Sequence, residues 1–214
     1  IFTATPQGLC ASLVNEEILS KVKIIDLSAD FRIKDVKTYE KWYGIEHKSP
    51  QFIEEAVYGL CEVNREDIKG ARLIANPGCY ATATELALIP LVASGLIETD
   101  SVIVDAKSGL TGAGKALSES SHFVNVHDNY VTYKLNHHQH IPEIVQSLQN
   151  FNPEMPEIQF STSLLPVNRG IMATVYCKLK KDVTVADVAS AFTKAYSDKP
   201  FVRVQDSLPE LHNV

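Results

Sequence analysis

The chain has 214 residues, of which 45% are hydrophobic and 21% charged, and its 20 Lys and Arg against 26 Asp and Glu give a formal net charge of −6. This composition excludes a disordered chain, and no basic tract or run of about 18 apolar residues suggests a nucleic-acid or membrane protein. The cysteines follow neither a disulfide nor a zinc-ribbon spacing, so we expect free thiols and a cytoplasmic location. They are Cys10, Cys61, Cys79 and Cys177.

The first third of the chain alternates strands with a helix, which is typical of a parallel α/β sheet. Residues 1–5 predict the end of a buried strand, and residues 9–20 have the apolar periodicity of a helix. Two more strands are predicted over residues 22–27 and 71–75. Residues 34–43 are charged and aromatic and predict a helical or irregular segment.

The rest of the chain indicates a mixed sheet with helices. Residues 80–94 predict a helix that Pro90 should kink or end halfway. Thr184 is the expected N-cap of a later helix. The remaining predicted helices cover residues 141–151 and 185–196, and the predicted strands cover residues 101–106, 158–165, 171–179 and 201–204.

Cys79 lies in the run Asn76-Pro77-Gly78-Cys79-Tyr80, where a strand ends, a tight turn follows and a helix begins. A thiol at that position faces free backbone N–H groups and the positive end of the helix dipole, which both stabilise a thiolate. The alternative is a buried structural cysteine, which we expect for the other three. The strand–turn–helix context favours Cys79 as a nucleophile.

Three histidines and a carboxylate are concentrated in His137-His138-Gln139-His140-Ile141-Pro142-Glu143. In one interpretation an imidazole is the general acid/base and Glu143 orients a neighbouring group. In a second, His138, His140 and Glu143 bind a metal, although no other ligand cluster is evident. A histidine-rich surface without function is the third.

Residues 108–115 form a glycine-rich loop after a predicted strand, without the spacing of a P-loop or a dinucleotide fingerprint. Its backbone N–H groups, flanked by Lys107 and Lys115, could hold a phosphate. Arg169, in the turn Pro166-Val167-Asn168-Arg169-Gly170, could bind a carboxylate or phosphate in a fork, or be a solvated turn residue.

Four motifs occur in an order that resembles a known family. They are Ala75-Asn76-Pro77-Gly78-Cys79-Tyr80-Ala81-Thr82, Ser108-Gly109-x-x-Gly112-Ala113-Gly114, His138-x-His140-x-Pro142-Glu143-Ile144 and Pro166-x-x-Arg169-Gly170. As a set they resemble the N-acetyl-gamma-glutamyl-phosphate reductases. Segments 26–32 and 58–65 resemble the same family, so the resemblance spans nearly the whole chain.

The resemblance implies an α/β protein with two domains. Residues 1–77 would be the C-terminal part of a Rossmann-like NADP-binding domain, and residues 78–214 an α+β catalytic and dimerisation domain with a mixed sheet. The family's glycine-rich nucleotide turn and its final segment are expected to lie outside residues 1–214, so we expect an internal fragment that is inactive alone. The family also implies a homo-oligomer.

The implied reaction is the NADPH-dependent reduction of an acyl phosphate to an aldehyde through a cysteine thioester, in arginine biosynthesis. Cys79 would be the nucleophile and His138 the acid/base, with His140 the second choice and Glu143 orienting the histidine. Asn76, Ser108 and Arg169 would contact the substrate. The expected cofactor-binding residues are Thr5, Pro6, Ser28, Gly109, Thr111 and Gly112.

Three other functions stay open. A related enzyme acting on aspartyl phosphate shares the thioester chemistry, but the His-x-His-x-Pro-Glu run favours the glutamyl enzyme. A Cys–His hydrolase or acyltransferase would need no nicotinamide. A non-enzymatic dimerisation and substrate-binding module is the third.

Overall fold

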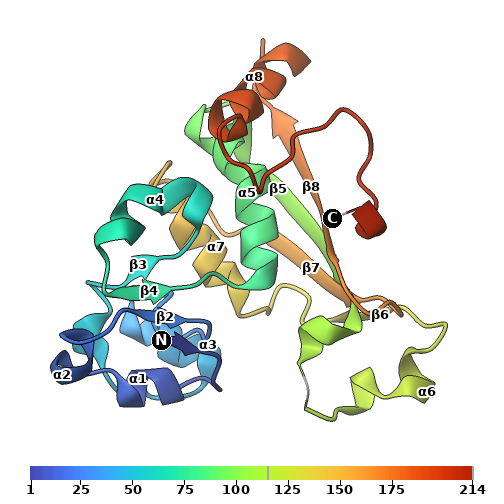
Figure 1. Cartoon of the computed structure of the whole chain (residues 1–214). Coiled ribbons are helices and arrows are strands. Elements are labelled where there is room, and N and C mark those ends of the chain that lie inside the picture. The colour runs from blue at the N-terminus through green and yellow to red at the C-terminus, as the bar shows by residue number, and fades with distance from the viewer. Residues whose placement is uncertain (115, 214) are drawn as a thin grey trace. The chain divides into compact units, whose positions relative to one another are not determined.

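The computed structural model describes residues 1–114 and 116–213, so Lys115, expected beside a phosphate, lies outside the described residues. The chain divides into two compact units, Ile1–Gly78 and Cys79–Val214 (Figure 1). The described residues form two four-stranded sheets, one in each unit.

The first unit is built on a parallel sheet with the strand order β1-β2-β4-β3. The strands are β1 (Phe2–Thr3), β2 (Ile24–Asp26), β3 (Val57–Tyr58) and β4 (Leu73–Ala75). The helices are α1 (Leu9–Leu13), α2 (Glu16–Leu19), α3 (Val36–Tyr43), the 3₁₀ helix η1 (Pro50–Phe52) and α4 (Cys61–Gly70). The buried core includes Ile24, Phe31 and Leu73. The parallel sheet expected from the sequence is confirmed.

The single helix predicted over residues 9–20 is wrong, because the chain leaves helical geometry between α1 and α2. Asn15 is extended, with φ −153° and ψ 168°, and its side chain accepts a hydrogen bond from the Ile18 N–H at 3.0 Å. An Asn side chain that caps a new helix competes with continuation of the preceding one. The apolar periodicity survives across the break, which is why the sequence suggested one helix.

The second unit contains a mixed sheet with the order β6-β7-β5-β8. β5 is parallel to β7 and antiparallel to β8, and β6 is antiparallel to β7. The strands are β5 (Ile97–Ser108), β6 (Val131–Tyr133), β7 (Gln159–Leu164) and β8 (Ile171–Leu179). The helices are α5 (Cys79–Ala93), α6 (Phe123–Val126), α7 (His140–Gln149) and α8 (Val185–Tyr196), with 3₁₀ helices η2 (Leu110–Ala113), η3 (Glu119–Ser121) and η4 (Leu211–Asn213). This confirms the mixed sheet.

Helix α5 packs against the mixed sheet and against α7 and α8 (Figure 1). Val102 and Val104 of β5 are buried, whereas Ile103 between them is 49% exposed. Ile103 pairs with Tyr176 of β8, which is 57% exposed. Because side chains alternate between the two faces of a strand, these two residues lie on the sheet face opposite the buried valines.

Of the two outcomes expected at Pro90, an end to the helix is wrong, since α5 runs from Cys79 to Ala93. A proline leaves the carbonyl four residues earlier without its helical N–H donor. The hydroxyl of Tyr196 in α8 donates to that carbonyl, Leu86 O, at 2.7 Å. A tertiary hydrogen bond therefore replaces the missing helical one.

The C-terminal predictions divide. Helix α8 has the predicted bounds, and Thr184 caps it in a reciprocal capping box with Asp187. The strand predicted over residues 201–204 is wrong: the Val202 N–H bonds to Lys199 O in a turn, and Phe201 is 91% exposed. Among the described residues no strand pairs with this segment, so its apolar alternation does not produce a strand.

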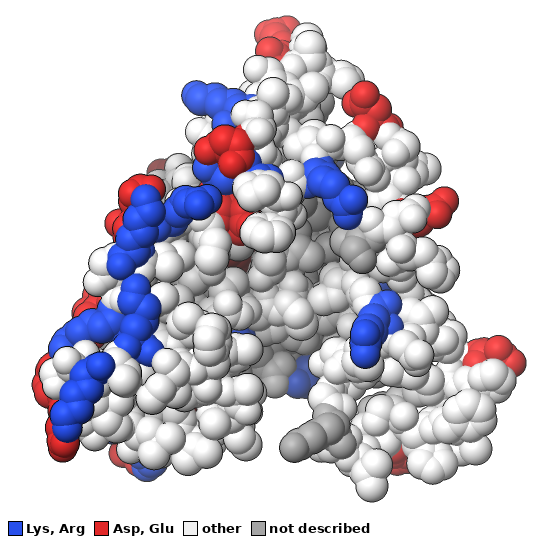
Figure 2. Space-filling model, in the orientation of Figure 1, with Lys and Arg blue, Asp and Glu red and all other residues white. Residues whose placement is uncertain are grey.

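Charged side chains of both signs lie next to each other on the face of the first unit shown in Figure 2. Within the part of the chain that the structure describes, no helix combines the length and apolar character needed to cross a bilayer.

Candidate active site

Cys79 is the first residue of α5, directly after the turn Asn76-Pro77-Gly78, and it is exposed. Neighbouring atoms desolvate the thiol, which opposes ionisation. A hydrogen bond and the positive charge of His140, with the backbone N–H groups of Tyr80 and Cys79, outweigh that effect and lower the pKa of the Cys79 thiol. The helix start thus holds an accessible, activated thiol.

His140 is the first residue of α7, and a carboxylate on the same helix orients its ring. Nδ1 of His140 lies 2.7 Å from Oε2 of Glu143, one turn further along. The Glu143 side chain is fully buried, and that of His140 is 14% exposed. The His140 side chain also hydrogen-bonds the Cys79 thiol. The imidazole thus contacts both the thiol and the carboxylate, an arrangement that suits a nucleophile with a base and an orienting group.

His138 was expected to be the acid/base, but the imidazole that hydrogen-bonds the Cys79 thiol is that of His140. The His138 ring is almost buried, and Tyr80, Tyr133 and Phe160 surround it edge-on at centroid distances of 5.4, 5.9 and 5.8 Å. Burial, with the positive charges of His140 and Lys134, lowers the pKa of His138 to about 3. The geometry therefore brings His140 rather than His138 to the thiol.

Two tyrosines that the sequence analysis did not single out complete the surroundings of the thiol. The Tyr133 hydroxyl donates to the Tyr80 hydroxyl at 3.3 Å, which in turn donates to Ser163 O at 3.1 Å. Burial is the largest cause of the raised pKa of Tyr133, and the charge of Cys79 adds to it. Tyr80 is readable from the sequence because it follows the cysteine, whereas Tyr133 joins the site only through pairing of β6 with β7.

The predicted glycine loop and the Arg169 turn lie against each other. A Cβ on Gly109 would come within 2.8 Å of the Arg169 backbone nitrogen, so this approach requires glycine. The Thr111 hydroxyl donates to Asn168 O at 2.8 Å, and the Arg169 side chain is exposed. The loop pair thus presents a cation, while Thr111 is committed to holding the loops together.

Two more expected residues have internal roles in this loop. The Ser108 hydroxyl is buried and donates to Gly109 O at 2.8 Å. A Cβ on Gly112 would lie 2.5 Å from the same hydroxyl oxygen. Ser108 and Gly112 therefore shape the loop from within.

The other expected residues lie in the first unit, after the carboxyl ends of its parallel strands, where α/β folds bind nucleotides. The Thr5 hydroxyl, beside Pro6, is buried and has no hydrogen-bond partner within the described residues, which fits a polar group of a bound nucleotide. The Ser28 hydroxyl donates to Asp26 Oδ2 at 2.8 Å, and the Asn76 amide donates to Pro77 O at 3.2 Å. Of these residues, Thr5 is the one whose hydroxyl has no partner within the described residues and could hydrogen-bond a ligand.

No group of three or more His, Cys, Asp or Glu side chains that could hold a metal ion occurs within residues 1–114 and 116–213. The carboxylate of Glu143 lies against His140.

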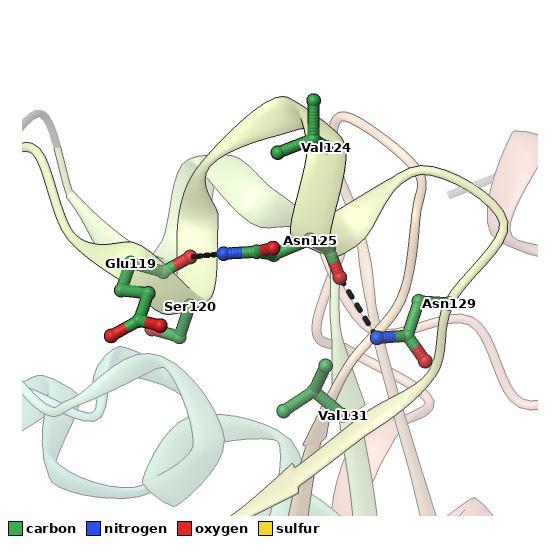
Figure 3. Close-up of a pocket in the computed structure, with 6 residues that line it drawn as sticks. All are labelled: Glu119, Ser120, Val124, Asn125, Asn129 and Val131. Carbon is green, nitrogen blue, oxygen red and sulfur yellow. Dashed lines mark hydrogen bonds between the residues drawn. The ribbon is translucent and has the colours of Figure 1, made fainter.

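A hollow of about 770 Å³ lies elsewhere in the second unit and contains none of the candidate site residues (Figure 3). Its lining residues are Glu119, Ser120, Val124, Asn125, Asn129 and Val131. The Asn125 amide donates to Glu119 O at 3.0 Å and the Asn129 amide to Asn125 O at 2.8 Å, so both amides are used in holding the segment together.

Two family models match the chain. One, described as semialdehyde dehydrogenase, dimerisation domain, matches residues 79–214. The chain belongs to the semialdehyde dehydrogenase family. A second model, described as semialdehyde dehydrogenase, NAD binding domain, matches residues 1–71. The match to the dimerisation domain begins at Cys79, the residue that opens α5.

Curated relatives confirm the resemblance noted from the motifs. The N-acetyl-gamma-glutamyl-phosphate reductase of Streptococcus thermophilus (strain ATCC BAA-491 / LMD-9) is 70% identical over 214 residues, which are 100% of this chain and 62% of that reductase. That of Streptococcus mutans serotype c is 58% identical over the same shares. The chain thus spans less than two thirds of the length of these relatives.

A solved structure supports the fold. Aspartate semialdehyde dehydrogenase II from Vibrio cholerae, complexed with ASA, superimposes with a TM-score of 0.65 at 13% identity, over 98% of this chain and 63% of that one. At that identity the likeness concerns the fold, a Rossmann-like unit followed by a mixed-sheet unit.

Proposed function

We propose that the complete protein reduces N-acetyl-gamma-glutamyl phosphate to N-acetylglutamate semialdehyde with NADPH, as a step of arginine biosynthesis. The observation that carries this proposal is the hydrogen bond between the Cys79 thiol and His140, whose ring is oriented by a second contact with Glu143. The identity of 70% to a named reductase supports the choice of substrate.

The first half-reaction forms a thioester. The Cys79 thiolate attacks the acyl carbon, and the tetrahedral adduct collapses with cleavage of the carbon–oxygen bond to phosphate. Inorganic phosphate leaves and the acyl group remains on sulfur. A thioester accepts hydride far more readily than a carboxylate, so the covalent route divides one difficult step into two easier ones.

The second half-reaction releases the aldehyde. When bound, NADPH would supply the hydride for the thioester carbonyl carbon. The His140 imidazolium donates a proton to the developing oxyanion, which gives a thiohemiacetal on Cys79. His140 then removes that proton as the carbon–sulfur bond breaks, and the aldehyde and the thiolate separate. Glu143 stabilises the charged imidazole throughout.

The exposed Arg169 is proposed to bind an anionic group of the substrate. Ser108 and Asn76 are proposed as further substrate contacts. Thr5 and Pro6 are proposed to contact the cofactor, and the buried Thr5 hydroxyl supports this role. Ser28, with Gly109, Thr111 and Gly112, is proposed to shape the cofactor region through the contacts described above rather than through a free polar group.

The experiment is a substrate panel on the complete protein, run as phosphate-dependent reduction of NADP⁺. We expect activity with N-acetylglutamate semialdehyde and little with aspartate semialdehyde, and NADP⁺ to be preferred over NAD⁺. Preference for aspartate semialdehyde would move the protein to the aspartyl enzyme. Phosphate-dependent acyl exchange without any nicotinamide reaction would indicate an acyltransferase.

We also propose that the protein is a homo-oligomer and that a second copy covers the open face of the mixed sheet. Ile103 and Tyr176 lie exposed as a cross-strand pair on that face, and the family model that spans it is described as a dimerisation domain. Tyr176→Lys should shift the complete protein toward the monomer in sedimentation, because it would place a charge in an apolar interface. Lys194→Glu, an exposed change in α8 away from that sheet face, is the matched control.

A further inference from the structure

The segment between β6 and α7, residues 134–139, carries an unusual backbone and leads directly into His140. Lys134 and Asn136 have positive φ values of 47° and 52°, a geometry that is uncommon outside glycine and that Asn adopts more readily than Lys. Asn136 supplies one anchor: its side-chain oxygen accepts the Phe160 N–H at 2.7 Å, and its own N–H bonds to Phe160 O at 2.9 Å. This fixes the middle of the segment to β7.

His138 supplies a second anchor at the end of the segment. Its ring is held among Tyr80 of α5, Tyr133 of β6 and Phe160 of β7, so three elements define its position. Aromatic rings in edge-to-face contact resist rotation as well as translation. The imidazole is therefore a fixed point beside the start of α7.

His138 uses this position to accept hydrogen bonds from the first turn of α7. Its Nδ1 accepts the N–H of His140 at 3.2 Å, and its carbonyl accepts the N–H of Ile141 at 3.0 Å. The first N–H groups of a helix have no partner within the helix, so an external acceptor fixes where the helix begins. Nδ1 must present a lone pair, which leaves the ring proton on Nε2.

We propose that His138 is a positioning residue: its ring acceptor fixes the first turn of α7, and thereby the His140 imidazole opposite Cys79, while His138 itself exchanges no proton with the substrate. This inference rests on the proposed function, because it assigns His140 the acid/base role. The strongly lowered pKa of His138, caused first by burial, agrees with a ring that stays neutral.

The test separates the acceptor from the ring with two variants of the complete protein. His138→Asn keeps an oxygen that can accept the N–H two residues ahead, as Asn does at helix starts. His138→Phe keeps a ring against Tyr80, Tyr133 and Phe160 but removes the acceptor. His137→Asn, at the exposed neighbouring histidine, is the matched control.

We expect His138→Phe to lower kcat roughly 100-fold, since a small misplacement of a catalytic group has about that effect, with the loss falling on kcat more than on KM. The kcat of His138→Asn should stay within roughly tenfold of the wild-type value. That loss is smaller than the about 10²–10⁴-fold loss expected when a general acid/base is removed. The pH profile of Cys79 alkylation by iodoacetamide, followed on the Cys79 peptide by mass spectrometry, should move to higher pH in His138→Phe and stay in place in His138→Asn.

Loss of two or more orders of magnitude in both variants with an unchanged alkylation profile would overturn the proposal, since that pattern indicates proton exchange by His138. A wild-type profile and activity in His138→Phe would overturn it as well. If His138→Phe does not fold, His138→Asn decides alone by the same two readouts. A wild-type protein without reductase activity would refute the proposed function. The alkylation profiles of the His138 variants could still be compared, because alkylation needs neither substrate nor nicotinamide.

Discussion

Each unit places a cysteine in the first turn of a helix and near a buried carboxylate. The pKa values of the two thiols nevertheless shift in opposite directions. Cys10 lies in α1 and Cys79 in α5. Burial raises the pKa of Cys10 to about 12, and the charges of Asp26 and Asp30 add to it, against a hydrogen bond from Thr3. The pKa of Cys79 is lowered.

The difference lies in what stands between carboxylate and sulfur. Near Cys10 the carboxylates act on the thiol directly, and a negative charge disfavours a thiolate. In the second unit Glu143 faces His140, and the imidazole faces the thiol. An interposed imidazole converts a buried carboxylate from a group that suppresses ionisation into one that supports it. A helix start alone does not activate a cysteine.

The largest expected effect contrasts the two thiols. Cys79→Ser should reduce phosphate-dependent NADP⁺ reduction by the complete protein by roughly three orders of magnitude or more, because the nucleophile is lost. Cys10→Ala should keep activity within about twofold and change stability only, as a small core truncation does. Steady-state rates check both, and equal losses in the two variants would break the comparison.

Removing the interposed imidazole should make Cys79 resemble Cys10. His140→Asn eliminates a hydrogen bond and a positive charge that lower the pKa of the thiol, so desolvation dominates and the pKa rises. At neutral pH less thiolate is then present, and the alkylation profile of the Cys79 peptide should move to higher pH. We expect kcat to fall about 10²–10⁴-fold. A larger loss in His138→Asn than in His140→Asn would restore the order expected from the motif.

We expect Asp30, one of the two carboxylates near Cys10, to stabilise the fold. Asp30 is buried and accepts the Gly8 N–H at 2.7 Å, the Ala11 N–H at 2.9 Å and the Tyr39 hydroxyl at 2.9 Å. Asp30→Asn replaces one acceptor oxygen with a donor and leaves a buried group unpaired, which should cost about 1–3 kcal/mol of unfolding free energy. Urea unfolding of the complete protein measures this. Glu40→Gln, a partly buried change in α3, is the control.

The smallest expected effect tests why α5 continues through Pro90. Tyr196→Phe removes the donor to Leu86 O and should cost about 1 kcal/mol. Pro90→Ala restores a backbone N–H for the same carbonyl, so the cost of Tyr196→Phe should shrink in that background. A double-mutant cycle on unfolding free energies gives the coupling, and additive costs would contradict our explanation.

Much of this protein is determined locally. β8 and α8 have their predicted bounds, because strand alternation and a capping box are local signals. The start of α5 at Cys79 follows from Asn76-Pro77-Gly78, since a turn after a strand leaves N–H groups free at that point. Cys79 could therefore be proposed as the nucleophile from its neighbours in the sequence.

What only the tertiary structure decided are the features that depend on a distant partner. Residues 201–204 alternate like a strand but pair with no strand in the described part of the chain, and Pro90 is tolerated because Tyr196 reaches Leu86. The two histidines of one motif are equivalent as sequence. The packing of α5, β6 and β7 encloses His138 and leaves His140 to face the thiol, because burial and hydrogen-bond direction are properties of the packed chain.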